Sequence, residues 1–122
     1  MQYIISGKVI RGDGYGKKLG FPTINLDRKN FLQLEEKPAF GIYAGKVKLM
    51  SNTRCWTYRA GIVIGSLDKK SLPKLEAHLI GYNGNAYGQK AILEINKFIR
   101  KFRKFKTEKE LIKQIGKDLK KC

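Results

Sequence analysis

Alternation of apolar and polar residues predicts several short β-strands over the first three-quarters of the chain. Between residues 42 and 50, Tyr43, Val47 and Leu49 alternate with Lys46 and Lys48, which is the pattern of a half-buried strand. Other β-rich segments are residues 2–9, 56–64, 75–80 and 91–98. Glycine and asparagine separate them, for example in the turn predicted around residues 83–85.

The last part of the chain has a helical pattern instead. Thr107 followed by Glu110 is a capping box, in which side chains satisfy free N–H groups at a helix start. Apolar residues then recur at a spacing of four and predict one apolar stripe: Leu111, Ile115 and Leu119, with Ile112 beside them. Lysines at 113, 117, 120 and 121 cover the remaining surface and suit the negative end of the helix.

These elements predict a mainly β fold in a single domain of residues 1–122. The 122 residues contain no low-complexity linker and no internal repeat. Several short strands followed by one helix favour a small antiparallel barrel or sandwich, closed or plugged by that helix. We expect the barrel to take up residues 1–106 and the C-terminal helix residues 107–121.

The charge balance is strongly positive and uneven. The formal net charge is +16, and residues 97–122 carry 11 Lys and Arg against 3 acidic residues. A field of this sign attracts nucleotides, RNA and anionic membranes alike. Charge therefore does not choose among these partners.

Few residues of this chain are soft metal ligands. Two cysteines and one histidine, His78, are too few for a disulfide framework or a zinc site. A bound metal would be a hard ion held by oxygen atoms, as magnesium is.

No apolar run approaches the roughly 20 residues that cross a bilayer, and Met1 leads directly into a strand-like stretch rather than a signal peptide. We therefore expect a cytoplasmic protein with no membrane partner.

A glycine-rich segment is the first candidate for phosphate chemistry. Gly12, Gly14 and Gly16 permit close approach to the backbone, and Lys17 and Lys18 follow them. The spacing does not match a Walker A loop, and residue 17 is not the glycine that a dinucleotide fingerprint needs. The glycines by themselves favour a long hairpin turn.

Two oxygen-bearing side chains follow this segment. Residues two apart in an extended chain point to the same side, so Thr23 and Asn25 are expected to share a face. The Thr23 hydroxyl and the Asn25 amide oxygen would then be able to meet one hard cation. The alternative is an ordinary polar strand edge.

The longer string is more specific, because it resembles the signature of riboflavin kinases. That family has a Pro-Thr-Ala-Asn core, and here isoleucine replaces the alanine in Pro22-Thr23-Ile24-Asn25. The resemblance also rests on Gly7, Val9, Gly12, residues 19–26, 41–45 and 75–79, Tyr87-Gly88, Arg100, Phe105 and residues 111–118. It covers nearly the whole chain and is poorest in residues 61–74, where part of the flavin or nucleotide wall is expected to differ.

The resemblance implies a fold and an activity. The fold is a six-stranded antiparallel Greek-key barrel with a C-terminal α-helix. The activity is transfer of the γ-phosphate of ATP to the ribityl 5'-hydroxyl of riboflavin, giving FMN and ADP. Family members of this kind use Mg²⁺ with ATP. Because the chain is too short for an adenylyltransferase module, FMN is the expected end product, and we expect a monomer.

The resemblance also implies roles for single residues. Glu76 matches the catalytic carboxylate that accepts the proton of the attacking hydroxyl. Thr23 and Asn25 match the magnesium ligands. The matching nucleotide-binding positions are Gly12, Lys17, Thr23, Leu79, Gly81 and Tyr87, and the matching flavin-binding positions are Arg100, Arg103 and Phe105.

Two alternatives stay open at this point. A basic β-barrel that binds RNA would explain the charge, the pair Trp56 and Tyr58 on one strand face, and the alternation of basic residues with phenylalanine in residues 97–106. Nothing in RNA binding, however, requires Thr23 and Asn25 together with Glu76. A catalytically inactive regulator that binds flavin or nucleotide is the second alternative, and retention of these three residues argues against it.

Overall fold

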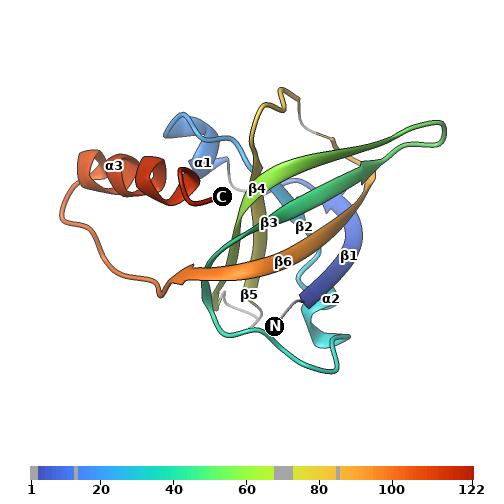
Figure 1. The fold of residues 1–122 in the computed structure, drawn as a ribbon, viewed down its shortest axis with the longest axis horizontal. Helices are drawn as coiled ribbons and strands as arrows, with labels where there is room; N and C mark the ends of the chain where they lie inside the picture. Colours follow the sequence, from blue (N-terminus) through green and yellow to red (C-terminus); the bar gives the residue numbers. More distant parts are fainter. Residues whose placement is uncertain (1–2, 13, 68–72, 85) are drawn as a thin grey trace.

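The computed structural model describes residues 3–12, 14–67, 73–84 and 86–122. Within these ranges six strands and three helices follow one another along the chain (Figure 1). The strands are β1 (Tyr3–Ile10), β2 (Ile24–Leu26), β3 (Gly41–Met50), β4 (Cys55–Leu67), β5 (Pro73–Leu79) and β6 (Lys90–Arg100). The helices are α1 (Tyr15–Lys18), α2 (Lys29–Leu32) and α3 (Glu108–Leu119). None of the helices in the described ranges is long and apolar enough to cross a bilayer.

The five longer strands confirm the predicted β-segments to within a few residues at each end. The first was expected to begin at Gln2, and the turn at 83–85 to include Asn85; both residues lie outside the described ranges. The one-turn helices α1 and α2 were not predicted, because four residues are too few to show a helical period.

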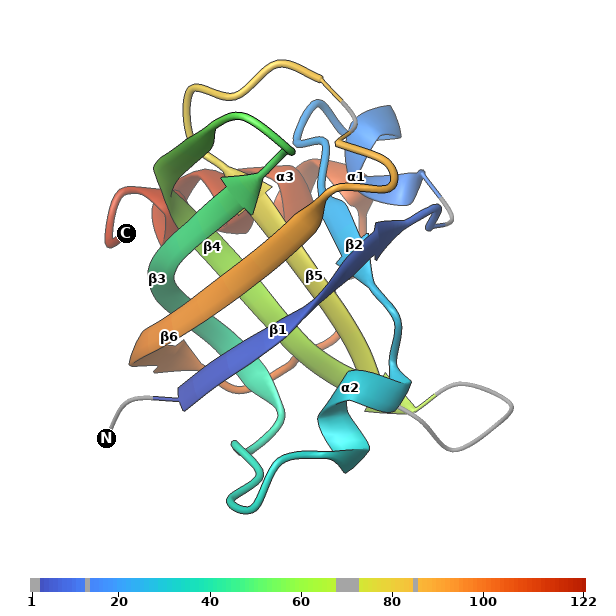
Figure 2. The same ribbon diagram turned by 90° about the vertical axis from the view of Figure 1, so that its right-hand side faces the viewer.

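The strands close into a barrel, which confirms the predicted architecture. Their order around it is β1-β2-β5-β4-β3-β6, and every pair described is antiparallel (Figure 2). Strands β3, β4 and β5 form consecutive hairpins, and β6 returns to lie beside β3, which is the Greek-key order. In the described residues each strand therefore has a neighbour on both sides, although β1 pairs with β2 only at Val9 and Ile10.

The pleat decides which side chains reach the core. In β5 the odd-numbered residues, such as Leu75 and Ala77, are buried inside the barrel, and the even-numbered Lys74, Glu76 and His78 face outward. Complete burial of one large apolar side chain contributes about 1.5–3 kcal/mol. The core therefore determines the register of β5 and, with it, the outward direction of Glu76.

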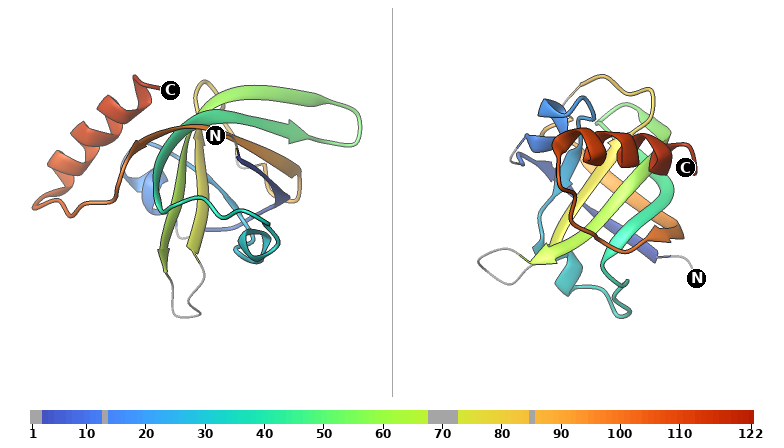
Figure 3. Two further views of the ribbon diagram at one scale, coloured as in Figure 1. Left: turned by 60° about the horizontal axis from the view of Figure 1, so that its bottom comes forward. Right: turned by 90° about the vertical axis from the view of Figure 1, so that its left-hand side faces the viewer.

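Helix α3 lies outside the barrel, beside β4 (Figures 1 and 3). The predicted cap is confirmed: the Glu110 backbone N–H donates to Thr107 Oγ1 at 3.2 Å, and the Lys106 N–H donates to Glu110 Oε2 at 3.3 Å. Leu119 approaches β4 so closely that a methyl group added to Gly61 would lie 2.9 Å from its Cδ2 atom. Ile112, predicted beside this stripe, is 37% exposed, and it does not line the cavity that Leu111, Ile115 and Leu119 line.

Gly116 gives the first testable expectation. It lies inside α3 with no atom within 4 Å of the position that a Cβ would take. Glycine is less favourable than alanine inside a helix by about 1 kcal/mol. Gly116→Ala should therefore raise the free energy of unfolding by about 0.5–1 kcal/mol, measured by urea denaturation. A variant no more stable than the parent would contradict this view of α3.

Candidate active site

One row of paired residues crosses the outside of the barrel. Arg100 on β6 pairs with Ile42 on β3, Ile42 with Val63 on β4, Val63 with Glu76 on β5, and Glu76 with Asn25 on β2. Paired residues point to the same face of a sheet. The row therefore presents two apolar residues between a guanidinium group and a carboxylate. At about 4.8 Å per strand, its charged residues are separated by about 14 Å along the surface.

A cavity of about 590 Å³ lies over this row. Its floor includes Ile42, Val63 and Glu76, and α3 contributes Leu111, Ile115 and Leu119 as one wall. Tyr15, Leu19 and Phe21 line the side near α1. This volume is typical of sites for drug-sized ligands. The predicted apolar stripe of α3 therefore lines a cavity outside the barrel.

The two predicted metal ligands and the predicted catalytic carboxylate meet at one end of the row. Asn25 and Glu76 are direct cross-strand partners, so their Cβ atoms lie about 4.5–5.5 Å apart. Ile24 between the two ligands is buried, whereas Thr23 and Asn25 are half-buried on the outer side, as the period of two predicts. Thr23 and Glu76 line the cavity. The structure thus brings Glu76 beside Thr23 and Asn25, although about fifty residues separate it from them in sequence.

The donor set in this corner consists of neutral oxygens and one carboxylate. Among the described residues, no group of three or more His, Cys, Asp or Glu has the arrangement of a metal site. A magnesium ion that shares its shell with substrate phosphates and water needs only one or two protein ligands. Thr23 and Asn25, with Glu76 beside them, fit that kind of site.

Gly12 and Gly16 pack against the two predicted metal ligands, and the nucleotide contact expected of Gly12 stays a prediction. A Cβ at Gly12 would overlap the side-chain amide of Asn25, and a Cβ at Gly16 would lie 2.6 Å from the Phe21 carbonyl oxygen and 3.3 Å from Thr23 Cγ2. The loop backbone therefore packs directly on the two predicted metal ligands. Glycine is needed there for contact within the protein, before any ligand is considered.

Gly12→Ala should consequently displace the Asn25 amide. Because misplacing a reactive group by about 1 Å reduces rates by about 100-fold, we expect the phosphoryl transfer implied by the sequence resemblance to slow by about 10- to 100-fold. The measurement is steady-state kinetics at varied Mg-ATP. Gly116→Ala is the matched control, since its added methyl group meets open space. Full activity of Gly12→Ala would show that Asn25 is not held by this contact.

His78 received no role from the sequence, but it contacts the same corner. Its Nδ1 lies 2.7 Å from the carbonyl oxygen of Pro22, the residue before Thr23. A carbonyl oxygen only accepts, so Nδ1 donates this bond. The ring also makes an edge contact with Phe21, with centroids 5.8 Å apart. His78 therefore connects β5 to the segment that carries Thr23.

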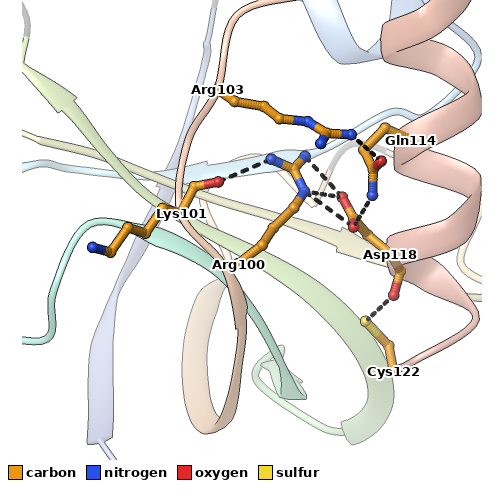
Figure 4. A network of polar contacts seen from close by, with 6 residues as sticks. All are labelled: Arg100, Lys101, Arg103, Gln114, Asp118 and Cys122. Carbon is orange, nitrogen blue, oxygen red and sulfur yellow. Dashed lines mark hydrogen bonds and ion pairs between the residues drawn. The ribbon is translucent and has the colours of Figure 1, made fainter.

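The Arg100 guanidinium is engaged by α3 (Figure 4). Its Nε donates to both Asp118 carboxylate oxygens at 3.1 and 3.0 Å, its second terminal nitrogen lies 2.9 Å from Oδ2, and Nη1 donates to the Lys101 carbonyl oxygen at 3.1 Å. Gln114 donates to the same carboxylate at 2.9 Å. Asp118 is 4% exposed. Arg100, a predicted flavin contact, lines the cavity. Its guanidinium group, however, is bound to Asp118 and so fixes the position of α3.

Two further predicted flavin contacts lie beside this network. The Phe105 ring is half-buried, with the Arg103 and Arg100 guanidinium carbons 5.1 and 5.7 Å from its centroid. Arg103 also donates to the Gln114 side-chain oxygen. Both residues line the cavity at the α3 end.

The four remaining nucleotide-binding predictions lie outside the lining of this cavity. Lys17 is exposed on α1, and Gly81 has a positive φ of 84° after β5. Tyr87 is 48% exposed, with the Arg11 guanidinium 5.3 Å from its ring centroid. The Leu79 side chain is 3% exposed inside the barrel, so only its backbone is placed to meet a ligand.

Burial raises the pKa values of two side chains, Cys122 after α3 and Tyr43 on β3. The Cys122 thiol donates to the Asp118 carbonyl oxygen at 3.4 Å, and burial raises its pKa. The Asp118 charge raises that pKa further, and Arg59 opposes the change. Burial also raises the pKa of Tyr43, whose hydroxyl donates to the Ala39 carbonyl oxygen at 2.6 Å. Both groups therefore stay protonated at neutral pH.

The sequence reasoning missed the cavity floor and the helix anchor. Ile42, Val63 and Asp118 lie in segments that the sequence analysis discussed, at 41–45, 61–74 and 111–118, but none of the three received a role of its own. Ile42 and Val63 are apolar residues at outward-facing positions of their strands, and this departure from alternation could have indicated a covered surface. Val63 lies in the segment where the family resemblance is poorest. The part of that segment at 68–72 lies outside the described residues.

Comparison with protein families gives one match that spans the chain. The family model described as "Flavokinase: Riboflavin kinase" matches residues 1–122. The bifunctional riboflavin kinase/FMN adenylyltransferase of Bacillus subtilis is 35% identical over 117 residues, which cover 95% of this chain and 36% of the relative. The chain thus spans about a third of the length of the first curated relatives that it matches.

Solved structures agree with the fold. A Streptococcus pneumoniae structure titled as a macrolide-efflux protein has a TM-score of 0.81 at 25% identity, covering 96% of this chain and 37% of that one. Riboflavin kinase from Trypanosoma brucei has a TM-score of 0.72 at 19% identity, covering 98% of this chain and 73% of that one. At 19% identity, the second comparison bears on the fold alone.

Proposed function

The chain belongs to the riboflavin kinase family, and from this membership we propose that it phosphorylates the ribityl 5'-hydroxyl of riboflavin with ATP, giving FMN and ADP. The observation that carries the proposal is the corner where Asn25 pairs directly with Glu76 beside Thr23. It combines oxygen ligands for a hard cation with a carboxylate that faces a cavity. Phosphoryl transfer needs these parts: charge neutralisation, a positioned nucleophile and a proton acceptor.

The ring system of the vitamin suits the apolar floor and the α3 end. Ile42 and Val63 offer a flat surface between Glu76 and Arg100, and Arg103 and Phe105 close the far end. A ring system lying there directs its ribityl chain toward Glu76. The Arg100–Asp118 pair keeps α3 in position to cover the ring.

Glu76 acts on the terminal hydroxyl. Its carboxylate accepts the hydroxyl proton as the oxygen attacks the γ-phosphorus, and the bond from that phosphorus to the bridging oxygen of ADP breaks. The Glu76 side chain emerges from a strand whose register is determined by buried neighbours, so the carboxylate is held by the barrel itself.

Thr23 and Asn25 would hold Mg²⁺ in this reaction. The ion supplies neutralisation of phosphate charge when bound. The protein keeps Thr23 and Asn25 on the outer side of the extended segment 23–25 and packs Gly16 and Gly12 against their side chains. A hydrogen bond joins the preceding Pro22 carbonyl to His78. These contacts position the donors before the ion arrives.

Incubation of the purified protein with riboflavin and Mg-ATP tests the proposal directly. Chromatography should show FMN and ADP in equal amounts, and omission of the divalent ion should abolish both products. Flavin binding without turnover would favour the inactive regulator instead. Absence of both flavin binding and turnover, together with RNA binding, would favour the RNA-binding barrel.

His78 gives a separate expectation as a positioning residue. His78→Phe removes the donor to Pro22 and should lower kcat by about tenfold, with a higher KM for Mg-ATP. Asparagine places an amide N–H near the position of Nδ1, so His78→Asn should recover most of this loss. Equal defects in both variants would assign His78 to packing alone.

A further inference from the structure

A strongly basic surface lies on the side of α3 that faces away from the barrel. We define this basic face by six exposed lysines: Lys104, Lys106, Lys109, Lys113, Lys117 and Lys120. The last four recur along α3 at spacings of four, four and three, so they form one stripe. From Lys109 to Lys120 the stripe extends about 16 Å along the helix axis.

A groove continues this stripe between α3 and the segment that precedes it. Its volume is about 420 Å³, and it lies on the other side of residues 103–106 from the cavity of the candidate active site. Among the described residues that line it, five are cationic and Glu110 alone is acidic. The basic face is therefore concave in part, which concentrates its field.

The six lysines of the basic face outnumber the three acidic residues of α3, which are Glu108, Glu110 and Asp118. The Asp118 carboxylate is buried and paired with Arg100, and Glu110 accepts a hydrogen bond from the Lys106 backbone N–H. Like charges at a spacing of four destabilise a helix by about 0.2–0.5 kcal/mol per pair. Lys109, Lys113 and Lys117 form two such pairs, which a bound polyanion would relieve.

We propose that the basic face binds the phosphate backbone of single-stranded nucleic acid, in addition to the kinase activity. A stripe of this length with an adjoining groove matches a chain of phosphates better than one nucleotide. A bilayer is the poorer partner, because a helix that lies in a membrane surface inserts its apolar side. Here Leu111, Ile115 and Leu119 face the cavity beside the barrel.

Fluorescence anisotropy with a labelled oligouridylate of about 20 nucleotides tests this. Each neutralised phosphate contributes about −0.7 to the slope of log K against log salt for single strands. Contacts from four to five lysines should therefore give a slope of about −3 between about 50 and 200 mM salt. Absence of binding at the lowest salt would overturn the proposal.

Two double charge reversals distinguish binding at the basic face from attraction by the net charge of the whole protein. Lys113→Glu with Lys117→Glu should weaken binding by at least about tenfold and reduce the magnitude of the salt slope by about 1.4, since two contacts of about 0.7 each are lost. The control, Lys29→Glu with Lys46→Glu, makes the same change in net charge on α2 and β3 and should weaken binding by less than about threefold. Both should keep riboflavin kinase activity, since none of these lysines lines the active-site cavity.

Two outcomes would contradict the proposal. Equal losses in both variants would mean that net charge alone attracts the oligonucleotide. Tighter binding to vesicles of phosphatidylcholine and phosphatidylserine than to the oligonucleotide, lost in the Lys113/Lys117 variant alone, would assign the face to membranes.

Should the charge reversal lower the melting temperature of the protein, the neutral pair Lys113→Gln with Lys117→Gln replaces it. This pair should weaken binding by about threefold and reduce the magnitude of the salt slope by about one to two.

Discussion

Replacing Glu76 by glutamine is expected to lower kcat for FMN formation by about 10²- to 10⁴-fold, the usual contribution of a positioned general base. Glutamine keeps the size of the side chain and can still accept hydrogen bonds, but it takes no proton at neutral pH. Because the ring of riboflavin is proposed to lie over Ile42 and Val63, its dissociation constant should change by less than about threefold. Rapid-quench kinetics and flavin fluorescence titration measure the two quantities.

Glu94→Gln is the matched control for this substitution. Glu94 lies on β6 and pairs with Lys48 at 3.7 Å, and it does not line the cavity. A surface pair of this kind contributes about 0–1 kcal/mol to stability, so the control should be fully active. Equal losses of turnover and riboflavin affinity in Glu76→Gln would assign Glu76 to binding or folding. An active Glu76→Gln enzyme would remove the proposed base.

Asp118→Ala is expected to destabilise the protein by about 3 kcal/mol, because it leaves a largely buried guanidinium group without its carboxylate. The Asp118 and Arg100 side chains are 6% and 18% exposed, and three contacts of 2.9–3.1 Å join them. Gln114 loses a partner as well. Urea denaturation measures the change, and riboflavin affinity should fall with it, since α3 forms one wall of the cavity.

A double-mutant cycle separates this anchor from a flavin contact. Arg100→Met in the Asp118→Ala background removes the unpaired charge, so the double variant should be more stable than Asp118→Ala alone. A role of Arg100 in flavin binding alone predicts the opposite pattern. Asp118→Ala would then leave the stability unchanged and raise only the dissociation constant for riboflavin.

Local sequence patterns were sufficient for most of the fold. The strand around Val47 and Leu49 has a period of two, and the helix after Thr107 has a capping box and a period near four; both signals are complete within about ten residues. The same locality explains the errors. Helices α1 and α2 are a single turn long, so neither shows a helical period in the sequence.

For the candidate site, the sequence by itself determined that Thr23 and Asn25 share a face, because two residues of one extended segment obey the pleat. It also determined that Glu76 and His78 share a face, for the same reason. Only the tertiary structure decided that Asn25 lies opposite Glu76, that His78 reaches the Pro22 carbonyl, and that Asp118 neutralises Arg100. These contacts join segments that are distant in sequence. Which residues of β2 and β5 lie opposite one another depends on how buried side chains such as Ile24 and Ala77 pack together inside the barrel.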